Sequence, residues 1–325
     1  MIKLDLYDRK ILKFLLDNSR EPVTKIAKKI KLRRENIVYR INRLIKNSLI
    51  RNFNTIFNEE LLGLEHYVLF LQITNIKKES EKLILKKLLD HPHITWLGTC
   101  AGKWSIVFDV ITKRKKLEAI IKDILSKLDG FIEDYVVLKL EKHEHYNFKL
   151  LGLNKKQNIK EYNKKELTKI DIDKTDLKII ETVNKNSKAS YIDISKDTNL
   201  TPNSIHNHLK KLEKGGAILG YTISLNWKEL GYEWYGLQFK MLKFDKDTEK
   251  NVTSYLRESK NIIFYYRYLG SQWDYDIGVV VKNSNELRDF INELRSNFPN
   301  EIKISDVFIV LDQLSDYKLP TGVFK

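Results

Sequence analysis

One segment of the sequence combines side chains of the types that can bind bases and phosphates. After the Lys31-Leu32 turn, Ile37, Ile41 and Leu44 recur at i, i+4 and i+7, which predicts a helix with these three side chains buried. The opposite face then mixes arginine, asparagine and lysine. Arginine can bind guanine O6 and N7, asparagine can bind adenine N6 and N7, and other cations can bind phosphates. The DNA contacts predicted on this helix and beside it are Arg33, Arg34, Asn36, Tyr39, Arg40, Asn42, Arg43, Lys46 and Arg51.

A second segment repeats this apolar spacing with a less basic face. Ile205, Leu209 and Leu212 define its buried side, and Thr201 followed by Pro202 is a favourable helix start. The opposite face has no arginine, so it predicts either a weaker DNA contact or only a solvated helix surface. The contacts predicted here are Asn203, Ser204, Asn207, Lys210 and Lys211.

No catalytic constellation accompanies these helices. His91 and His93 flank a proline, and His143 and His145 flank an acid, but neither pair has the spacing of a structural zinc site. Cys100 is the single cysteine of the sequence. The sequence also lacks a P-loop, a dinucleotide-binding glycine motif and a nucleophile elbow. We therefore expect no catalytic residue, no metal and no cofactor.

The positive charge is concentrated at the beginning of the chain. The 325 residues include 58 Lys and Arg against 43 Asp and Glu, a net charge of +15. Residues 1–64 alone carry 15 basic and 7 acidic side chains, whereas residues 171–232 carry 9 and 8. Localised basicity favours a polyanionic partner such as double-stranded DNA. The alternative is a chain that is simply rich in lysine throughout.

The expected cellular location depends on signals for membrane insertion, secretion and disulfide formation, which the sequence lacks. No apolar run approaches the roughly 18 residues of a membrane span, and the first residues do not resemble a secretory signal. A lone cysteine cannot form an internal disulfide. We expect a cytoplasmic protein without membrane contact.

An internal repeat organises the chain. Residues 4–67 align with residues 172–235 without a gap, at an offset of 168, with 18 identities in 64 positions. Asp5/Asp173, Ser19/Ser187 and Gly63/Gly231 are among these identities. The similarity resumes later at an offset of 169, for example at Trp104/Trp273. The protein is therefore two copies of one unit, separated by a polar Lys/Asn/Glu stretch at 154–169.

Each copy changes its periodicity near the shared glycine. Asp5 or Asp8 can cap the first of three short helices, which precede a β-rich pair in residues 49–57, so a helix-turn-helix with a two-stranded wing is predicted. A β-α-β-β-α-β order follows, which is the ferredoxin-like arrangement of an α+β fold. The expected strands are 67–74, 94–99, 104–112 and 132–140, and in the second copy 235–244, 262–269, 273–281 and 302–311. The expected helices of these modules are 78–89, 115–128, 247–258 and 285–297. The predicted domains are 1–64 (winged head), 65–153 (ferredoxin-like module), 154–169 (linker), 170–232 (second winged head) and 233–325 (second module).

This order of elements, present twice, resembles the leucine-responsive regulator/AsnC (feast/famine) family of prokaryotic transcription factors. The opening stretch from Leu4 to Leu12, the helix-turn-helix after it and the strands leading to Leu62-Gly63 carry the resemblance. It implies DNA binding by the heads, and dimerisation and effector binding by the ferredoxin-like modules. The effectors of that family are often amino acids. The covalent tandem departs from the family.

The resemblance also implies an effector site at one turn. Family members carry a glycine followed closely by an acid between the second and third strands of the module. Gly270 and Asp274 match this pattern, whereas the first copy has Ser105 at the acidic position. An effector ammonium is thus expected only in the second module, at Gly270, Ser271, Gln272 and Asp274. The alternative is that both turns are plain hairpins whose Trp104 and Trp273 fill the core.

The two modules are expected to pair, because two helices cover only one face of each sheet. The result is either an intrachain pseudo-dimer or a homo-oligomer in which chains exchange modules. Within one chain, pairing would place the heads on half-sites about one turn, ~34 Å, apart.

Two other classes of function compete with a transcription regulator. Siroheme decarboxylases are similar to this family in fold and also occur as fused two-unit chains, and residues 264–268 offer tyrosine and arginine contacts to a tetrapyrrole. A pure effector-sensing or assembly protein is the third possibility.

Overall fold

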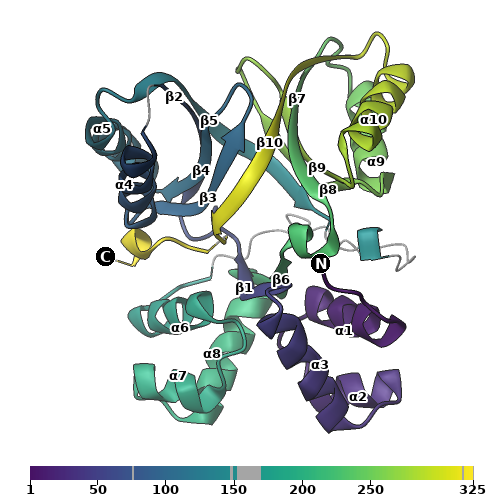
Figure 1. Ribbon diagram of the computed structural model, residues 1–325. Coiled ribbons are helices and arrows are strands. Elements are labelled where there is room, and N and C mark those ends of the chain that lie inside the picture. Colours follow the sequence, from purple (N-terminus) through teal and green to yellow (C-terminus); the bar gives the residue numbers. More distant parts are fainter. Residues whose placement is uncertain (75–76, 147–148, 152–169, 317, 325) are drawn as a thin grey trace.

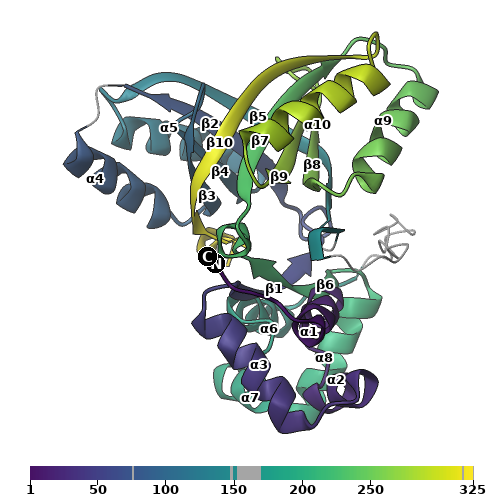
Figure 2. The same ribbon diagram turned by 45° about the vertical axis from the view of Figure 1, so that its right-hand side comes forward.

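The computed structural model describes residues 1–74, 77–146, 149–151, 170–316 and 318–324. Two helical heads lie side by side below a β-barrel, and the N-terminus begins near the joint between them (Figures 1 and 2). The expected linker at 154–169 lies outside the described residues. No described helix is long and apolar enough to cross a bilayer.

Each head consists of three helices that begin as the sequence predicts. Asp5 caps the first helix while Asp8, three residues later, returns the hydrogen bond, and Asp173 and Asp176 do the same in the second copy. Thr201 caps its helix with proline in the first turn. The bounds are α1 (Leu6–Asp17), α2 (Val23–Ile30), α3 (Arg34–Lys46), α6 (Lys174–Lys185), α7 (Tyr191–Thr198) and α8 (Pro202–Lys214).

The expected two-stranded wing within each head is wrong. Each head supplies one strand, and β1 (Ile50–Phe57) pairs antiparallel with β6 (Ile218–Leu225) of the other head. The pairing is possible because both strands are apolar enough to be covered by helices of both heads. Side chains reinforce it across the repeat: the hydroxyls of Ser19 and Ser187 lie 2.6 Å apart, and Thr55 donates to the Val183 carbonyl at 2.7 Å. The two heads therefore form one body.

The two ferredoxin-like modules close into one barrel, in the order β10-β3-β4-β2-β5-β8-β9-β7. The β-α-β-β-α-β order of each module is confirmed. The strands are β2 (Glu65–Ile73), β3 (Ile94–Ala101), β4 (Ile106–Thr112), β5 (Ile132–His145), β7 (Glu233–Met241), β8 (Ile262–Tyr268), β9 (Tyr275–Val281) and β10 (Ile302–Ser315). The helices are α4 (Lys78–Leu89), α5 (Leu117–Lys127), α9 (Lys246–Glu258) and α10 (Ser284–Asn297), and short 3-10 turns are η1 (Arg114–Lys116), η2 (Lys149–Leu151), η3 (Trp227–Leu230) and η4 (Thr321–Val323).

Closure of the barrel depends on two strands that are longer than predicted. Both β5 and β10 have 14 residues. Past Leu140, β5 leaves its own sheet and pairs with β8 of the second module, while β10 beyond Ile309 pairs with β3 of the first. The expected pairing of the modules within one chain is thereby confirmed, and it occurs through strand edges.

The barrel interior is packed with aromatic rings. Trp104 and Trp273 are fully buried and lie 6.0 Å apart by ring centroids, with Phe70 against both. Phe308 lies over Gly236, where an added Cβ would meet its ring at 2.1 Å, so only glycine fits there. The expectation that both tryptophans fill the core is confirmed.

Candidate nucleic-acid interface and effector site

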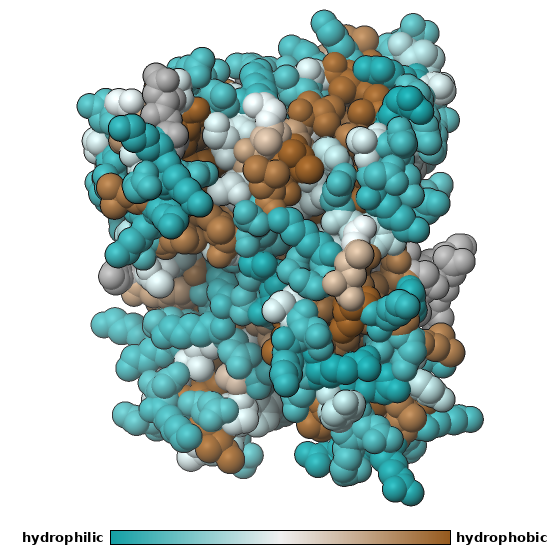
Figure 3. Space-filling model, in the orientation of Figure 1, coloured by the Kyte–Doolittle hydropathy of each residue, from teal (hydrophilic) through white to brown (hydrophobic). Residues whose placement is uncertain are grey.

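The helix-turn-helix of the first head presents α3 at the tip of the molecule, where hydrophilic side chains predominate (Figures 1 and 3). The turn before it needs a left-handed residue, and Lys31 supplies it at φ +62°. Ile37, Ile41 and Leu44 are buried as predicted. Of the predicted DNA contacts on α3 and its start, Arg33, Arg34, Asn36, Tyr39, Asn42 and Lys46 remain exposed, and Glu35 and Ile45 are exposed beside them.

Two other predicted DNA contacts, Arg40 and Arg43, are instead tied to α1. Both guanidiniums form ion pairs with Asp8, whose side chain is 1% exposed, and Arg40 also binds Asp5 at 2.7 Å. The second head repeats this arrangement with His208 and Lys211 on Asp176. The charges on α3 are thus partly neutralised, and these two arginines fix the helix rather than stand free on its exposed face.

Arg51 lies away from both recognition helices. Its guanidinium donates to the Gln313 carbonyl at 2.8 Å and to the Asp316 carboxylate at 3.3 Å, at the joint between the heads and the barrel. Arg51 was predicted to contact DNA because β1 follows α3 closely in the chain, but β1 runs inward toward the barrel.

On the second head, α8 exposes a polar face with little charge. Asn203, Asn207, Lys210 and Lys211 are exposed, and Ser204 is half-buried beside the Thr201 cap. Lys211 binds Asp176 at 2.6 Å. Asp173, Asp176 and His208 also bring three ligand-type atoms close together, but the Lys211 ammonium already supplies the cation there.

The turn predicted to hold an effector has its carboxylate engaged by the backbone. Gly270 has φ +72°, and Ser271 hydrogen-bonds within the turn to Trp273, while Gln272 is exposed. The buried Asp274 accepts from the Met241 amide at 2.7 Å.

In the first module, Ser105 plays the same part as this aspartate. Its hydroxyl accepts from the Ile73 amide at 3.1 Å, the position equivalent to Met241. Asp274 and Ser105 therefore both accept a backbone hydrogen bond at the same place in their modules. This shared structural role accounts for an acid at one turn and a serine at the other.

A buried ionic cluster at the foot of the barrel was missed by the sequence analysis. His66 lies between Glu59 at 3.3 Å and Asp109 at 3.2 Å, with its side chain 3% exposed. Burial opposes protonation, but the two carboxylates raise the pKa of His66 to about 10. The available signal was Asp109, the one charged residue in the mainly apolar strand 106–112.

Two more histidines flank this cluster. His143 and His145 are exposed on β5, with ring centroids 5.6 Å apart and with Tyr266 packed against both. Although solvent reaches part of each side chain, the protein atoms crowded around the ring of His145 desolvate it and, with the neighbouring histidines, lower its pKa to about 3. Desolvation likewise lowers the pKa of His143.

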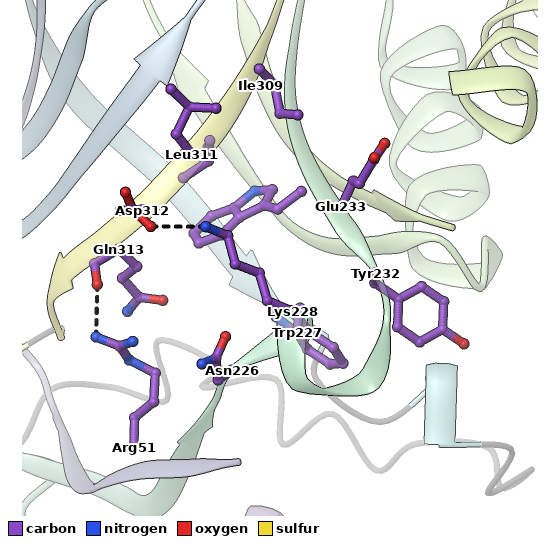
Figure 4. Close-up of a pocket in the computed structure, with 12 residues that line it drawn as sticks. Arg51, Asn226, Trp227, Lys228, Tyr232, Glu233, Ile309, Leu311, Asp312 and Gln313 are labelled. Atoms are coloured by element: carbon purple, nitrogen blue, oxygen red, sulfur yellow. Dashed lines mark hydrogen bonds and ion pairs between the residues drawn. The ribbon is translucent and has the colours of Figure 1, made fainter. Parts of the chain in front are cut away.

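The second half of the repeat carries a pocket where the heads meet the barrel. Figure 4 shows Lys228 and Asp312 joined across it by an ion pair of 2.8 Å, with the Arg51 guanidinium on the Gln313 carbonyl below. Trp227, Tyr232 and Trp234 line it from η3 and the start of β7, and Ile309 and Leu311 line it from β10.

Two helix-turn-helix heads, each followed by a ferredoxin-like module, define this chain as a tandem helix-turn-helix protein. An AsnC-type helix-turn-helix domain model matches residues 4–45, and a winged helix-turn-helix DNA-binding model matches residues 172–218. The chain is 34% identical over 130 residues to the HTH-type transcriptional regulator FL11 of Pyrococcus abyssi, covering 39% of this chain and 83% of that protein. FL11 of Pyrococcus furiosus is 35% identical over 127 residues, covering 38% of this chain and 81% of that protein. The chain belongs to the Lrp/AsnC family of helix-turn-helix regulators.

One solved structure resembles the whole chain in fold. The siroheme decarboxylase NirDL superposes with a TM-score of 0.65 at 12% sequence identity, over 97% of this chain and 94% of that one. The tandem arrangement of heads and modules is thus shared with a protein of little sequence similarity.

Proposed function

We propose that this protein is a sequence-specific DNA-binding transcription regulator that acts as an intrachain pseudo-dimer. The observation that carries the proposal is the body of two heads, in which α3 presents exposed arginine, asparagine and lysine side chains at the tip. Arg33, Arg34 and Lys46 suit phosphates or guanine, and Asn36 and Asn42 suit base edges. In this proposal the chain has no catalytic residues, and it works in the cytoplasm on double-stranded DNA.

The internal ion pairs of the heads support this proposal. Because Asp8 orients Arg40 and Arg43 against α1, α3 is held in a fixed position on its head. A base-reading helix has to be positioned in this way, since hydrogen bonds to base edges depend on direction.

Binding-site selection on random duplexes tests the proposal. We expect one sequence to be enriched, and we expect the double substitution Asn36→Ala and Asn42→Ala to reduce affinity for it about tenfold or more, because each base contact is worth roughly 1–3 kcal/mol. Lys122→Ala on the outer helix α5 is the matched control and should bind as the unaltered protein does. Enrichment of no sequence, or equal losses in the two variants, would refute the proposal.

A siroheme decarboxylase-like enzyme is the second candidate. Its support is the full-length fold shared with NirDL and the exposed imidazoles of His143 and His145 beside aromatic rings. Against it, Arg267, the cation of the segment first considered for a tetrapyrrole, is bound by Glu141 and Glu249. Incubation with siroheme tests this directly: a shifted absorption spectrum with loss of substrate carboxyl groups supports the enzyme, and an unchanged spectrum excludes it.

A further inference from the structure

Four consecutive cations follow β4 on the first module. Residues 113–116 read Lys-Arg-Lys-Lys, and all four side chains are exposed. No hydrogen bond or ion pair joins these side chains to another residue in the part of the chain that the structure describes. Within that part of the chain, no direct contact neutralises the charge of this basic run.

The fold does not require cations at this position. The matching residues of the second module, 282–285 at the offset of 169, read Lys-Asn-Ser-Asn, and Asn283 caps α10 by accepting from two backbone amides. In the first module neither η1 nor α5 has a side-chain cap. The helix dipole also opposes cations at a helix start. The first module thus lacks a favourable cap and carries four like charges instead, which is expected where a residue type serves binding rather than stability.

The basic run lies at the end of the first module that faces the second head. Thr112, directly before it, pairs with Glu65 at the start of β2, and Ile111 packs into the buried core of the second head. Figure 1 shows this head, with α6, α7 and α8, below the first module. A basic surface therefore stands above the less basic of the two heads.

Further basic side chains continue the surface down to that head. Burial lowers the pKa of His93 and the charge of Lys116 lowers it further, which places this lysine near the imidazole. The ring of His93 lies against Gly322 near the C-terminus, where an added Cβ would be 2.5 Å from it. The same C-terminal segment reaches the second head, where the Lys318 ammonium donates to the Lys185 carbonyl at 3.2 Å. Basic side chains thus extend from the first module to α6.

This line of charge is much weaker on the other side of the molecule. The first head has Asp17 at the position of Lys185, and the second module keeps one lysine at the four positions of the basic run. Lys185 pairs with Glu181, but both side chains are exposed, so a phosphate can replace this carboxylate at little cost. A polyanion that follows the basic side chains is therefore held beside the second head and not beside the first.

We propose that residues 113–116, with Lys318 and Lys185, form a second DNA-binding surface, which holds the duplex that flanks the operator on the side of the second head. The inference rests on the proposed function, because the heads place the operator. DNA that leaves the second head bends toward the barrel, and the phosphate contacts offset the bending energy. The flanking contacts supply affinity that the weakly charged α8 lacks.

Binding to a short and a long duplex tests this surface. The triple substitution Arg114→Asn, Lys115→Ser and Lys116→Asn introduces the residues of the second module. It should leave affinity unchanged for a core duplex that spans only the two heads, which also shows that the variant is folded. For the same duplex with flanks of about 20 base pairs, we expect affinity to fall at least fivefold and the slope of log affinity against log salt to decrease by up to about 3.

A charge-matched control removes three exposed cations of the second module, by Lys250→Ser, Arg288→Asn and Arg295→Asn. This variant should bind both duplexes as the unaltered protein does. Equal losses in the two variants, or a long duplex that the unaltered protein binds no more tightly than the core, would overturn the inference alone. Absence of binding to the core duplex would refute the proposed function and this inference with it, so the two failures are distinguishable.

A tethered cleavage reagent locates the flanking DNA directly. Cys100 is the single cysteine and is buried, so a cysteine introduced at the surface is the accessible thiol. An iron chelate attached at Lys115→Cys should cut the flanking duplex on one side of the operator only. The same chelate at Ser284→Cys, the matching exposed position of the second module, should cut neither flank. Cuts from Lys115→Cys on neither side or on both sides, or equal cuts from the two positions, would overturn the inference.

Discussion

Asp8 is a single carboxylate with three structural tasks. It completes the cap of α1 and binds both Arg40 and Arg43 of α3. We expect Asp8→Ala to lower the free energy of unfolding by about 1–3 kcal/mol, since a lost cap costs ~1 kcal/mol and the two half-exposed arginines can partly rehydrate. Urea unfolding measures the change, with the exposed Asp129→Ala as control. A difference between the variants of less than about 0.5 kcal/mol would contradict this role.

Asp276 makes stability depend on pH. Burial, together with the nearby Asp109, raises the pKa of Asp276 to about 8 from its ordinary 3.8. The folded state therefore holds this proton more tightly than the unfolded state, so its contribution to stability is complete below about pH 4 and is lost as pH rises toward 8, by up to ~1.4 kcal/mol per unit.

Asp276→Asn removes this titration. We expect the free energy of unfolding of the variant, relative to the unaltered protein, to rise between pH 5 and 8 in urea titrations. A difference that stays constant over this range would show that the carboxyl group has an ordinary pKa.

At the scale of the elements, the turn between α2 and α3 holds a lysine in an unfavourable backbone conformation, and a substitution can relieve this strain. Lys31 adopts φ +62°, a conformation that lysine disfavours, while the second copy has Asn199 at φ +58° in the same turn. Lys31→Asn should raise the free energy of unfolding by roughly 0.5–1 kcal/mol, and Asn199→Lys should lower it by a similar amount. Thermal unfolding of both variants gives the comparison. Changes of the same sign in the two would mean that the turn conformation is not the cause.

Element types were predictable because local periodicity determines them. The expected helix 78–89 coincides with α4, and the other helices and strands of the modules begin within about two residues of their predicted positions. Strand partners were not predictable in this way. The wing was assigned to each head because adjacent residues usually pair, yet β1 finds its partner 168 residues away. Strands β5 and β10 are likewise longer than predicted because their ends pair with the edge strands β8 and β3 of the other module.

The candidate site was likewise predictable only where a single element determines it. The spacing of Ile37, Ile41 and Leu44 located the exposed face of α3, because one helix determines which side is buried. Whether Arg40 and Arg43 are available to DNA depends on α1, which carries Asp8. From the sequence Asp8 was identified only as a helix cap, so its ion pairs with the two arginines were not predicted. The pocket at Trp234 required knowledge of both the heads and the barrel.

At the scale of the whole molecule, we expect the two heads to contribute unequally to DNA binding. Residues 1–64 carry 15 basic and 7 acidic side chains, against 9 and 8 for residues 171–232. Replacing Arg34 and Lys46 together by alanine should weaken binding more than replacing Lys210 and Lys214, and should reduce the salt slope by up to about 2 if both contact phosphate. Fluorescence anisotropy over a series of salt concentrations measures both quantities. Equal losses would refute the asymmetry.

The pairing of β1 with β6 within one polypeptide has a consequence for orientation. Two identical chains that paired in this way would separate on dilution and would present the same surface to each half of a palindrome. A covalent pair keeps its partner at any concentration, and its two halves can diverge in sequence. Under the proposed function, a body with dissimilar ends would occupy an asymmetric operator in one direction only, and it would distinguish the upstream from the downstream side of a promoter.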